Sequence, residues 1–275
     1  MLVLFVVSTA AVAAPARGAV TPRLPAAAIS QLRTSSYAVV EGYLNPAQVQ
    51  LIKNDVDALR TEGRFKVAGV GDAADNRLDD DVRRCEQCFL YPTMKHGGGG
   101  HAEGRTLLYD VLDGVRDSLQ VGTSTQLDSL LTEGLYAAYP QGGFYRRHVD
   151  AFPGTPQEIR AFSYLLYFNE GWTAADGGQL RLHTDGGGEQ RPPNARPSYV
   201  DVEPKAGTLA IFRSDLPHEV LDTAAPRLAP QLHRARRHAR SRRGVPKEAN
   251  TVGLFSLVAT KPHRAPFSQH YSGAH

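Results

Sequence analysis

The chain has 275 residues, enough for one large domain with helical additions or at most two domains. Hydrophobic residues make up 41% of it and its mean hydropathy is −0.33, values typical of a globular protein rather than of a disordered chain. No segment approaches the ~20 consecutive apolar residues that a membrane-spanning helix needs, so we expect no transmembrane span.

The net charge of +3 is divided unevenly along the chain. From Arg227 onward there are ten Lys or Arg and a single acid, Glu248, a net charge of +9, whereas the preceding part has 21 bases and 27 acids, a net charge of −6. Such asymmetry is typical of an anion-binding arm or of a solvated tail. No aromatic residues interleave the arginines to stack on bases, so we do not expect a nucleic-acid partner.

The first residues form an apolar stretch from Leu2 to Ala14 that ends in a small-residue pattern, Ala11-Val-Ala13. This arrangement is typical of a signal-peptide core, although no basic residues precede it. As a leader it would direct the protein to the secretory pathway or an organelle, and as a truncated start it would leave the protein in the cytoplasm. The sequence leaves the compartment open. We assign residues 1–30 to a leader or a disordered N-terminus.

Residues 37–43 favour a short strand, because β-branched and aromatic residues cluster there. A helix is expected to follow, with Asn45 as its N-cap, Pro46 in its first turn and Gln48 at the capping-box position. Its apolar positions repeat at helical spacing, and Gly63 is a plausible end.

Four successive glycines, residues 97–100, predict a mobile loop, since glycine loses much entropy when it is ordered. His96 and His101 flank this loop, and we interpret both as solvated surface residues. The two cysteines, Cys85 and Cys88, form a single CxxC pair. Without a second pair a zinc site is weakly indicated, and we interpret both as incidental thiols.

Residues 107–131 indicate one or two helices, after which the pattern changes to short strands separated by Gly, Pro or Asp turns. We expect strands at residues 133–139, 144–150, 161–169, 179–183, 198–202 and 208–213. Strands of this length and spacing are typical of an antiparallel sandwich or barrel. The predicted class is therefore mainly β with flanking helices.

His148, Asp150 and His218 are the candidate metal ligands. Two imidazoles and one carboxylate form the facial triad of non-haem Fe(II), which leaves three coordination positions open. In an extended strand, residues two apart point to the same side, so His148 and Asp150 can reach one ion. We expect no catalytic side chain beyond this metal site.

The motifs around these ligands resemble the 2-oxoglutarate and Fe(II)-dependent dioxygenases, and within them the prolyl 4-hydroxylase-like group that includes the hypoxia-sensing prolyl hydroxylases. The resemblance covers about a third of the chain and runs in the family's order. It rests on Tyr139-Pro, Phe144-Tyr-Arg-Arg-His148-Val-Asp150, Tyr164-Leu-Leu-Tyr167-Phe-Asn169, Trp172, Gly177-Gly-Gln-Leu-Arg181, Glu203 to Phe212, Ser214-Asp and Pro217-His218-Glu-Val220.

This resemblance implies a double-stranded β-helix, or jelly roll, and hydroxylation of a prolyl residue in a protein or peptide. It also implies Fe(II), 2-oxoglutarate as co-substrate, and L-ascorbate as a reductant of oxidised iron. The family places a basic residue nine or ten positions after the second histidine, and Arg227 is nine after His218. Tyr167 matches a tyrosine that hydrogen-bonds the co-substrate, and Tyr139 matches another lining residue; both also fit the interpretation of ordinary core tyrosines.

The resemblance fails after residue 229, where the family continues with a strand that closes the sheet. Pro230 cannot donate to a ladder, and the basic run after it lacks alternating apolar residues. Three explanations remain open: residues 251–258 replace the strand, the sequence is an artefact such as intron read-through, or the tail is a functional basic arm. We divide the chain into a helical and loop support region (31–135), a dioxygenase core (136–229) and an atypical basic tail (230–275).

Three other functions remain as alternatives to the prolyl hydroxylase. An oxygenase could act on another substrate such as nucleic acid, as the basic tail suggests. A metal-binding homologue could keep the triad but be catalytically impaired, because its pocket does not close. A zinc hydrolase with the same ligands is less favoured, since hydrolytic zinc sites use other ligand sets. The sequence does not identify the substrate or the oligomeric state.

Overall fold

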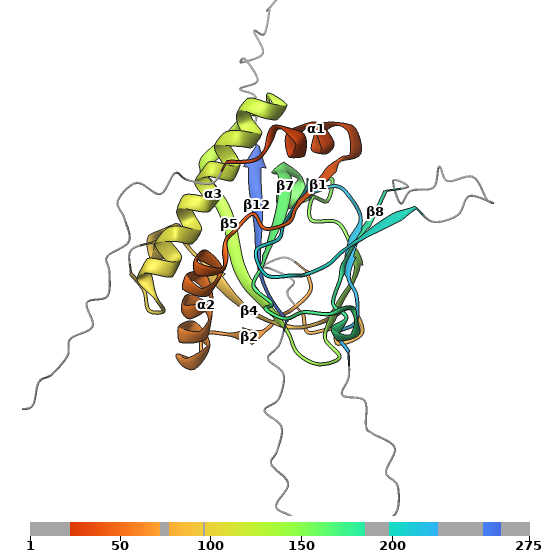
Figure 1. Ribbon diagram of the computed structural model, residues 1–275. Helices are drawn as coiled ribbons and strands as arrows, with labels where there is room; N and C mark the ends of the chain where they lie inside the picture. Colours follow the sequence, from red (N-terminus) through yellow and green to blue (C-terminus); the bar gives the residue numbers. More distant parts are fainter. Residues whose placement is uncertain (1–22, 72–76, 96, 185–197, 225–249, 260–275) are drawn as a thin grey trace, which may run out of the picture.

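The computed structural model describes residues 23–71, 77–95, 97–184, 198–224 and 250–259. Its described strands form two antiparallel sheets, which Figure 1 shows on opposite sides of the molecule's interior. The larger sheet has the order β1 (Tyr37–Val40), β10 (Leu209–Arg213), β7 (Arg160–Tyr167), β12 (Asn250–Ala259), β5 (Leu127–Tyr139), β4 (Glu86–Leu90), β2 (Lys66–Val67). The smaller sheet has the order β3 (Arg83–Arg84), β6 (Phe144–His148), β11 (His218–Val220), β8 (Leu180–His183), β9 (Tyr199–Val202). The prediction of a mainly β jelly roll with flanking helices is confirmed.

Three helices, α1 (Ala26–Ser35), α2 (Pro46–Thr61) and α3 (Ala102–Thr123), pack with the larger sheet. Figure 1 shows α2 and α3 together on the side of this sheet away from β8. α2 has the predicted capping box, in which Asn45 and Gln48 satisfy each other's backbone N–H groups. None of the helices among the described residues is both long and apolar enough to cross a bilayer.

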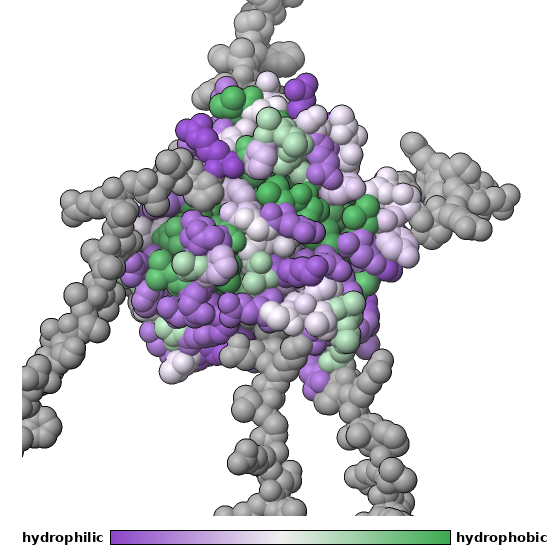
Figure 2. All heavy atoms as spheres, viewed as in Figure 1, coloured by the Kyte–Doolittle hydropathy of each residue, from purple (hydrophilic) through white to green (hydrophobic). Residues whose placement is uncertain are grey.

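The two faces of the larger sheet bury separate apolar clusters. One cluster joins the sheet to the helices, and the other fills the space between the two sheets. On the face shown in Figure 2, hydrophilic residues predominate and apolar residues gather towards the middle. The inner cluster supports the candidate site, because Tyr139, Tyr167 and Val220 belong to it.

The glycine loop is tied down rather than free. Gly98, Gly99 and Gly100 have positive φ, a conformation that glycine adopts without steric cost. Arg105 donates to the carbonyl oxygens of Gly97 and Gly99, at 2.9 Å each. The mobile-loop prediction missed this contact, because Arg105 lies on the following helix and its buried guanidinium needs acceptors.

His101, expected to be a solvated residue, instead caps α3: its Nδ1 accepts from the backbone N–H of Gly104. His96 lies outside the described residues. Where one or two helices were predicted at 107–131, the structure has a single helix, α3, that ends at Thr123, and β5 begins at Leu127, earlier than predicted. The reason is local, since Ser124 takes a left-handed conformation that stops α3.

The strand that the sequence pattern lacked is β12. It lies between β5 and β7 and pairs antiparallel with both, with Val252 opposite Ala137 and Tyr167. Of the three explanations for the unusual C-terminal sequence, the structure therefore supports the replacement strand. Residues 225–249, which include Arg227 and most of the basic run, lie outside the described residues, as does the predicted N-terminal leader.

Candidate metal centre

The three predicted ligands come together at the end of one strand pair. His148 is the last residue of β6, and His218, the first of β11, is its direct cross-strand neighbour. The strand predicted at residues 144–150 ends two residues earlier than expected, because β6 stops at His148. Asp150 is instead held through its backbone, because its N–H donates to the Ser214 carbonyl at 2.9 Å and its own carbonyl accepts from Arg160 at 3.0 Å.

The side chains converge on one point. Each residue offers a ligand atom within 4.8 Å of the other two, and no other such group of His, Cys, Asp or Glu was found among the described residues. The His148 Nε2 atom lies 3.7 Å from one Asp150 carboxylate oxygen, and the His218 Nε2 atom lies 3.6 Å from the other. Two imidazole nitrogens and a carboxylate thus surround a volume the size of one ion.

The hydrogen bonds of the imidazoles leave this volume without a donor. His148 Nδ1 lies 2.8 Å from the Arg146 carbonyl oxygen, and His218 Nδ1 lies 2.9 Å from that of Leu216. A proton on each Nδ1 leaves an Nε2 lone pair, which is how second-shell acceptors orient metal-binding histidines. Both Nε2 atoms and Asp150 Oδ2 are buried without a hydrogen-bond partner among the described residues. Three buried acceptors facing one another fit a cation.

Electrostatics favour the protonation states that a metal requires. Burial, and next the neighbouring His218, lower the pKa of His148 to about 3. Burial acts to raise the pKa of Asp150, but the nearby His218 and His148 and a hydrogen bond from Ser163 bring it below its ordinary value. At neutral pH the His148 ring is therefore neutral and the Asp150 carboxyl is ionised.

A β-bulge places an aromatic ring against the first ligand. His218 pairs with His148, and Val220 pairs with Tyr145, so β6 has one extra residue at this point. The Tyr145 ring consequently stacks on the His148 ring at a centroid distance of 3.6 Å. Neither residue spacing nor composition reveals a bulge, so no role for Tyr145 was predicted from the sequence.

Arg83 is a second residue that the sequence did not reveal. Its guanidinium lies 4.5 Å from the centre of the Tyr145 ring, and its Nε donates to Cys85 Sγ at 3.1 Å.

Both Cys85 and Cys88 are free and buried, and they belong to opposite apolar clusters of the larger sheet. The CxxC spacing therefore does not form a redox pair, in agreement with the interpretation of two separate thiols.

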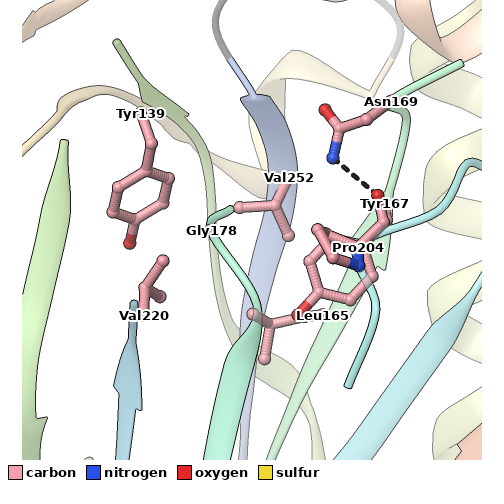
Figure 3. Close-up of a pocket in the computed structure, with 8 residues that line it drawn as sticks. All are labelled: Tyr139, Leu165, Tyr167, Asn169, Gly178, Pro204, Val220 and Val252. Atoms are coloured by element: carbon pink, nitrogen blue, oxygen red, sulfur yellow. Dashed lines mark hydrogen bonds between the residues drawn. The ribbon is translucent and has the colours of Figure 1, made fainter. Parts of the chain in front are cut away.

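A pocket lies between the two sheets, and its lining residue Val220 is two residues after His218 on β11. Figure 3 shows Tyr139 from β5 and Tyr167 from β7 on either side of Val252 from β12. The lining is completed by Leu165, Asn169, Gly178, Pro204 and Val220. None of these eight residues is a cation. Asn169 is engaged in the wall, because its Nδ2 donates to the Pro204 carbonyl oxygen at 2.7 Å.

The two predicted co-substrate tyrosines both line this pocket. Burial raises the pKa of each hydroxyl, so both stay protonated. The Tyr167 hydroxyl is buried and has no hydrogen-bond partner among the described residues. The predicted basic residue, Arg227, lies outside the described part of the chain.

Comparison with known proteins agrees with this site. Residues 134–234 match the family model of the 2OG-Fe(II) oxygenase superfamily, and the match includes all three candidate ligands. The chain resembles a Pseudomonas putida prolyl-4-hydroxylase structure with a TM-score of 0.61 and 25% identity, over 86% of this chain and 98% of that one. This part of the chain, residues 134–234, belongs to the 2OG-Fe(II) oxygenase superfamily.

Two curated relatives, one of them named as a prolyl hydroxylase, match most of the chain. It is 26% identical over 207 residues to the hypoxia-inducible factor prolyl hydroxylase of Caenorhabditis elegans, which is 73% of this chain and 27% of that protein. It is 35% identical over 199 residues to mouse Egl nine homolog 1, which is 70% of this chain and 44% of that protein. The chain therefore spans less than half the length of these curated relatives.

Proposed function

We propose that the protein is an Fe(II)- and 2-oxoglutarate-dependent dioxygenase that hydroxylates a prolyl residue in a protein or peptide. The observation that supports this most directly is the set of three buried, unpartnered ligand atoms on His148, Asp150 and His218. Two nitrogens and one carboxylate oxygen are the facial ligand set of non-haem Fe(II) oxygenases. The relative and the solved structure that are named prolyl hydroxylases support the choice of a prolyl substrate.

Bound Fe(II), with 2-oxoglutarate and O₂, supplies the oxidative decarboxylation and the hydroxylation of an unactivated C–H bond. The chain itself provides position and shelter. The carbonyl groups of Arg146 and Leu216 fix the two imidazoles with their Nε2 atoms inward. The Tyr145 ring covers one face of His148 and keeps water from it. L-Ascorbate would act as the reductant that returns oxidised iron to the ferrous state.

The pocket beside the centre is the proposed binding site of 2-oxoglutarate. Its Tyr167 hydroxyl has a proton to donate and no partner within the described part of the chain, so it would bind a carboxylate of the co-substrate. Tyr139 would line the opposite side. Because a buried carboxylate needs a cation and the described lining has none, we assign that cation to Arg227.

Arg227 can be tested against a second basic residue. Lys247 lies three residues before the first residue of β12, the strand that contributes Val252 to the pocket. We expect Arg227→Ala to weaken 2-oxoglutarate binding to the Mn(II)-loaded protein by at least about tenfold, with Lys247→Ala close to wild type. Calorimetry measures both. The reverse order would move the anchoring role to Lys247.

The alternative of a catalytically impaired homologue depended on a missing strand. β12 occupies a central position in the larger sheet, so the structural reason for an open pocket no longer applies.

The activity test uses purified protein with Fe(II), 2-oxoglutarate, ascorbate and a prolyl peptide. We expect succinate release and a peptide heavier by one oxygen atom, both abolished in His148→Ala. Equal turnover by wild type and His148→Ala would reject the proposal.

A further inference from the structure

One face of β4 leads from the candidate site to the surface. Cys88 and Leu90 belong to the cluster between the sheet and the helices. Since side chains alternate along a strand, Gln87 and Phe89 lie on the other face, which is the inner one. Cys85, just before β4, belongs to the inner cluster as well. These three residues form what we call the β4 stripe: Cys85, Gln87 and Phe89.

The register with β5 gives the stripe a direction. Gln87 pairs with Ala137, and Phe89 pairs with Leu135. Ala137 is fully buried in the inner cluster and Leu135 is half-buried. Tyr139, which lines the co-substrate pocket, lies two residues after Ala137 along β5. The stripe therefore runs from the pocket end of β5 outward to a partly open end.

The inner end of the stripe is connected to a metal ligand. Cys85 Sγ accepts from Arg83, whose guanidinium lies on the Tyr145 ring. Tyr145 in turn stacks on His148. A substrate that approaches the metal along β4 would therefore pass Phe89 first, then Gln87, before it reaches the ligands.

Two features of the stripe indicate an absent partner. The Gln87 Oε1 atom is buried and has no hydrogen-bond partner among the described residues, a costly arrangement for an amide oxygen. Phe89 is 52% exposed, although the residues on both sides of it in β4 are buried. A buried acceptor beside an exposed aromatic ring suits a ligand that is apolar but has an N–H donor.

We infer that Gln87 and Phe89 bind the peptide substrate. Gln87 accepts a hydrogen bond from the peptide main chain, and Phe89 packs on an apolar side chain or on the proline ring. This inference rests on the proposed prolyl hydroxylation. The proline nitrogen has no hydrogen, so the donor is the N–H of a residue next to the proline. Gln87 is in this sense a substrate-positioning residue of the same site.

The test is a double-mutant cycle between protein and peptide. The probe is a fluorescein-labelled peptide with one proline flanked by valine and alanine, together with two versions N-methylated at the amide before or after the proline. Fluorescence anisotropy measures binding to protein loaded with Mn(II) and 2-oxoglutarate under anaerobic conditions. The variants are Gln87→Leu and Phe89→Ala. Their controls, Gln50→Leu and Val121→Ala, change an exposed amide on α2 and an exposed apolar residue on α3.

We expect Gln87→Leu to weaken binding of the unmodified peptide about fivefold, the value of one hydrogen bond. One of the two N-methyl groups should weaken binding to wild type to a similar extent and have no further effect on Gln87→Leu. Phe89→Ala should weaken all three peptides, and the controls none. Since Gln87→Leu removes an unpartnered buried group, it should unfold at the same temperature as wild type or higher.

Peptide affinity that is unchanged in Gln87→Leu, or an N-methyl effect that persists in it, overturns the role of Gln87 while wild-type turnover still supports the proposed function. Absence of both peptide binding and hydroxylation in the wild type overturns the proposed function and this inference together. A drop in 2-oxoglutarate affinity in Gln87→Leu, with peptide affinity intact, would place the residue in the co-substrate pocket instead and would also overturn the inference.

Discussion

The protein buries two charged clusters, and they differ in how their polar atoms are satisfied. The first joins α2, α3 and β5 through Asp55, Arg105 and Tyr136, all inaccessible to solvent. Asp55 accepts from the Arg105 Nε at 3.1 Å, from the Tyr136 hydroxyl at 3.0 Å and from the backbone N–H of His101 at 2.7 Å. Arg105 also donates to carbonyl groups of the glycine loop. This cluster is complete by itself.

The second cluster is the triad of His148, Asp150 and His218. Its side chains are slightly more exposed, but its inward atoms are buried and have no hydrogen-bond partner among the described residues. Burial of charge alone therefore does not distinguish a functional site from an internal support. Buried polar atoms without a hydrogen-bond partner do distinguish the two, because native proteins satisfy nearly all of their buried polar atoms.

The largest expected effect comes from breaking the complete cluster. Arg105→Ala leaves the Asp55 carboxylate buried without its cation, so we expect the free energy of unfolding to fall by about 3–5 kcal/mol in urea titrations. The control Lys53→Ala removes the helical ion pair with Asp57, and should change this free energy by less than about 0.5 kcal/mol. Folded Arg105→Ala protein should still bind Mn(II), and loss of that binding would show that the clusters are coupled.

The triad of His148, Asp150 and His218, which we call the open cluster, should respond to pH. The pKa of His148 is about 3 in the folded protein and ordinarily 6.5, so below pH 6.5 the unfolded chain takes up a proton that the folded chain does not. For metal-free protein we expect this residue to lower the free energy of unfolding by roughly 1 kcal/mol per pH unit as pH falls from below 6.5 towards 3. The difference between wild type and His148→Ala isolates this contribution. Parallel stability curves for the two proteins would contradict it.

A matched pair of tyrosine variants compares one hydroxyl of the complete cluster with one hydroxyl of the pocket. Tyr136→Phe removes a donor to a buried carboxylate, and we expect it to destabilise the protein by about 1.5–3 kcal/mol. Tyr167→Phe removes an unpartnered hydroxyl and should change stability by less than about 0.5 kcal/mol. The same change should weaken 2-oxoglutarate binding about tenfold by calorimetry. A Tyr167→Phe variant that binds 2-oxoglutarate as wild type does would remove this residue from the co-substrate site.

Local sequence signals predicted the elements whose causes are local. The capping box of Asn45 and Gln48 marks the start of α2 within one residue, and short runs separated by Gly, Pro or Asp turns indicated most strands of the core. The short strands β2, β3 and β4 were missed, because two to five residues next to a polar loop give little periodicity. The ligand residues were predicted from their types and spacing, and the structure brings their donor atoms together.

Features that depend on long-range partners could not be predicted. The sequence offered residues 251–258 as a strand only as one of three explanations, because the central position of β12 depends on pairing with β5 and β7. The glycine loop is held by Arg105, whose buried position no local pattern reveals. The stacking of Tyr145 on His148 depends on a bulge opposite β11. In each case the cause lies on another element of the fold.

The most direct test of the open cluster is a metal titration. Anaerobic calorimetry of Fe(II) into wild-type protein, with Mn(II) as a redox-stable repeat, measures affinity and stoichiometry. We expect one ion per chain in the wild type, and loss of that binding in His148→Ala, Asp150→Ala and His218→Ala, each of which should remain folded. Metal binding that survives all three substitutions, or a wild type that binds none, would contradict a single ferrous centre at these residues.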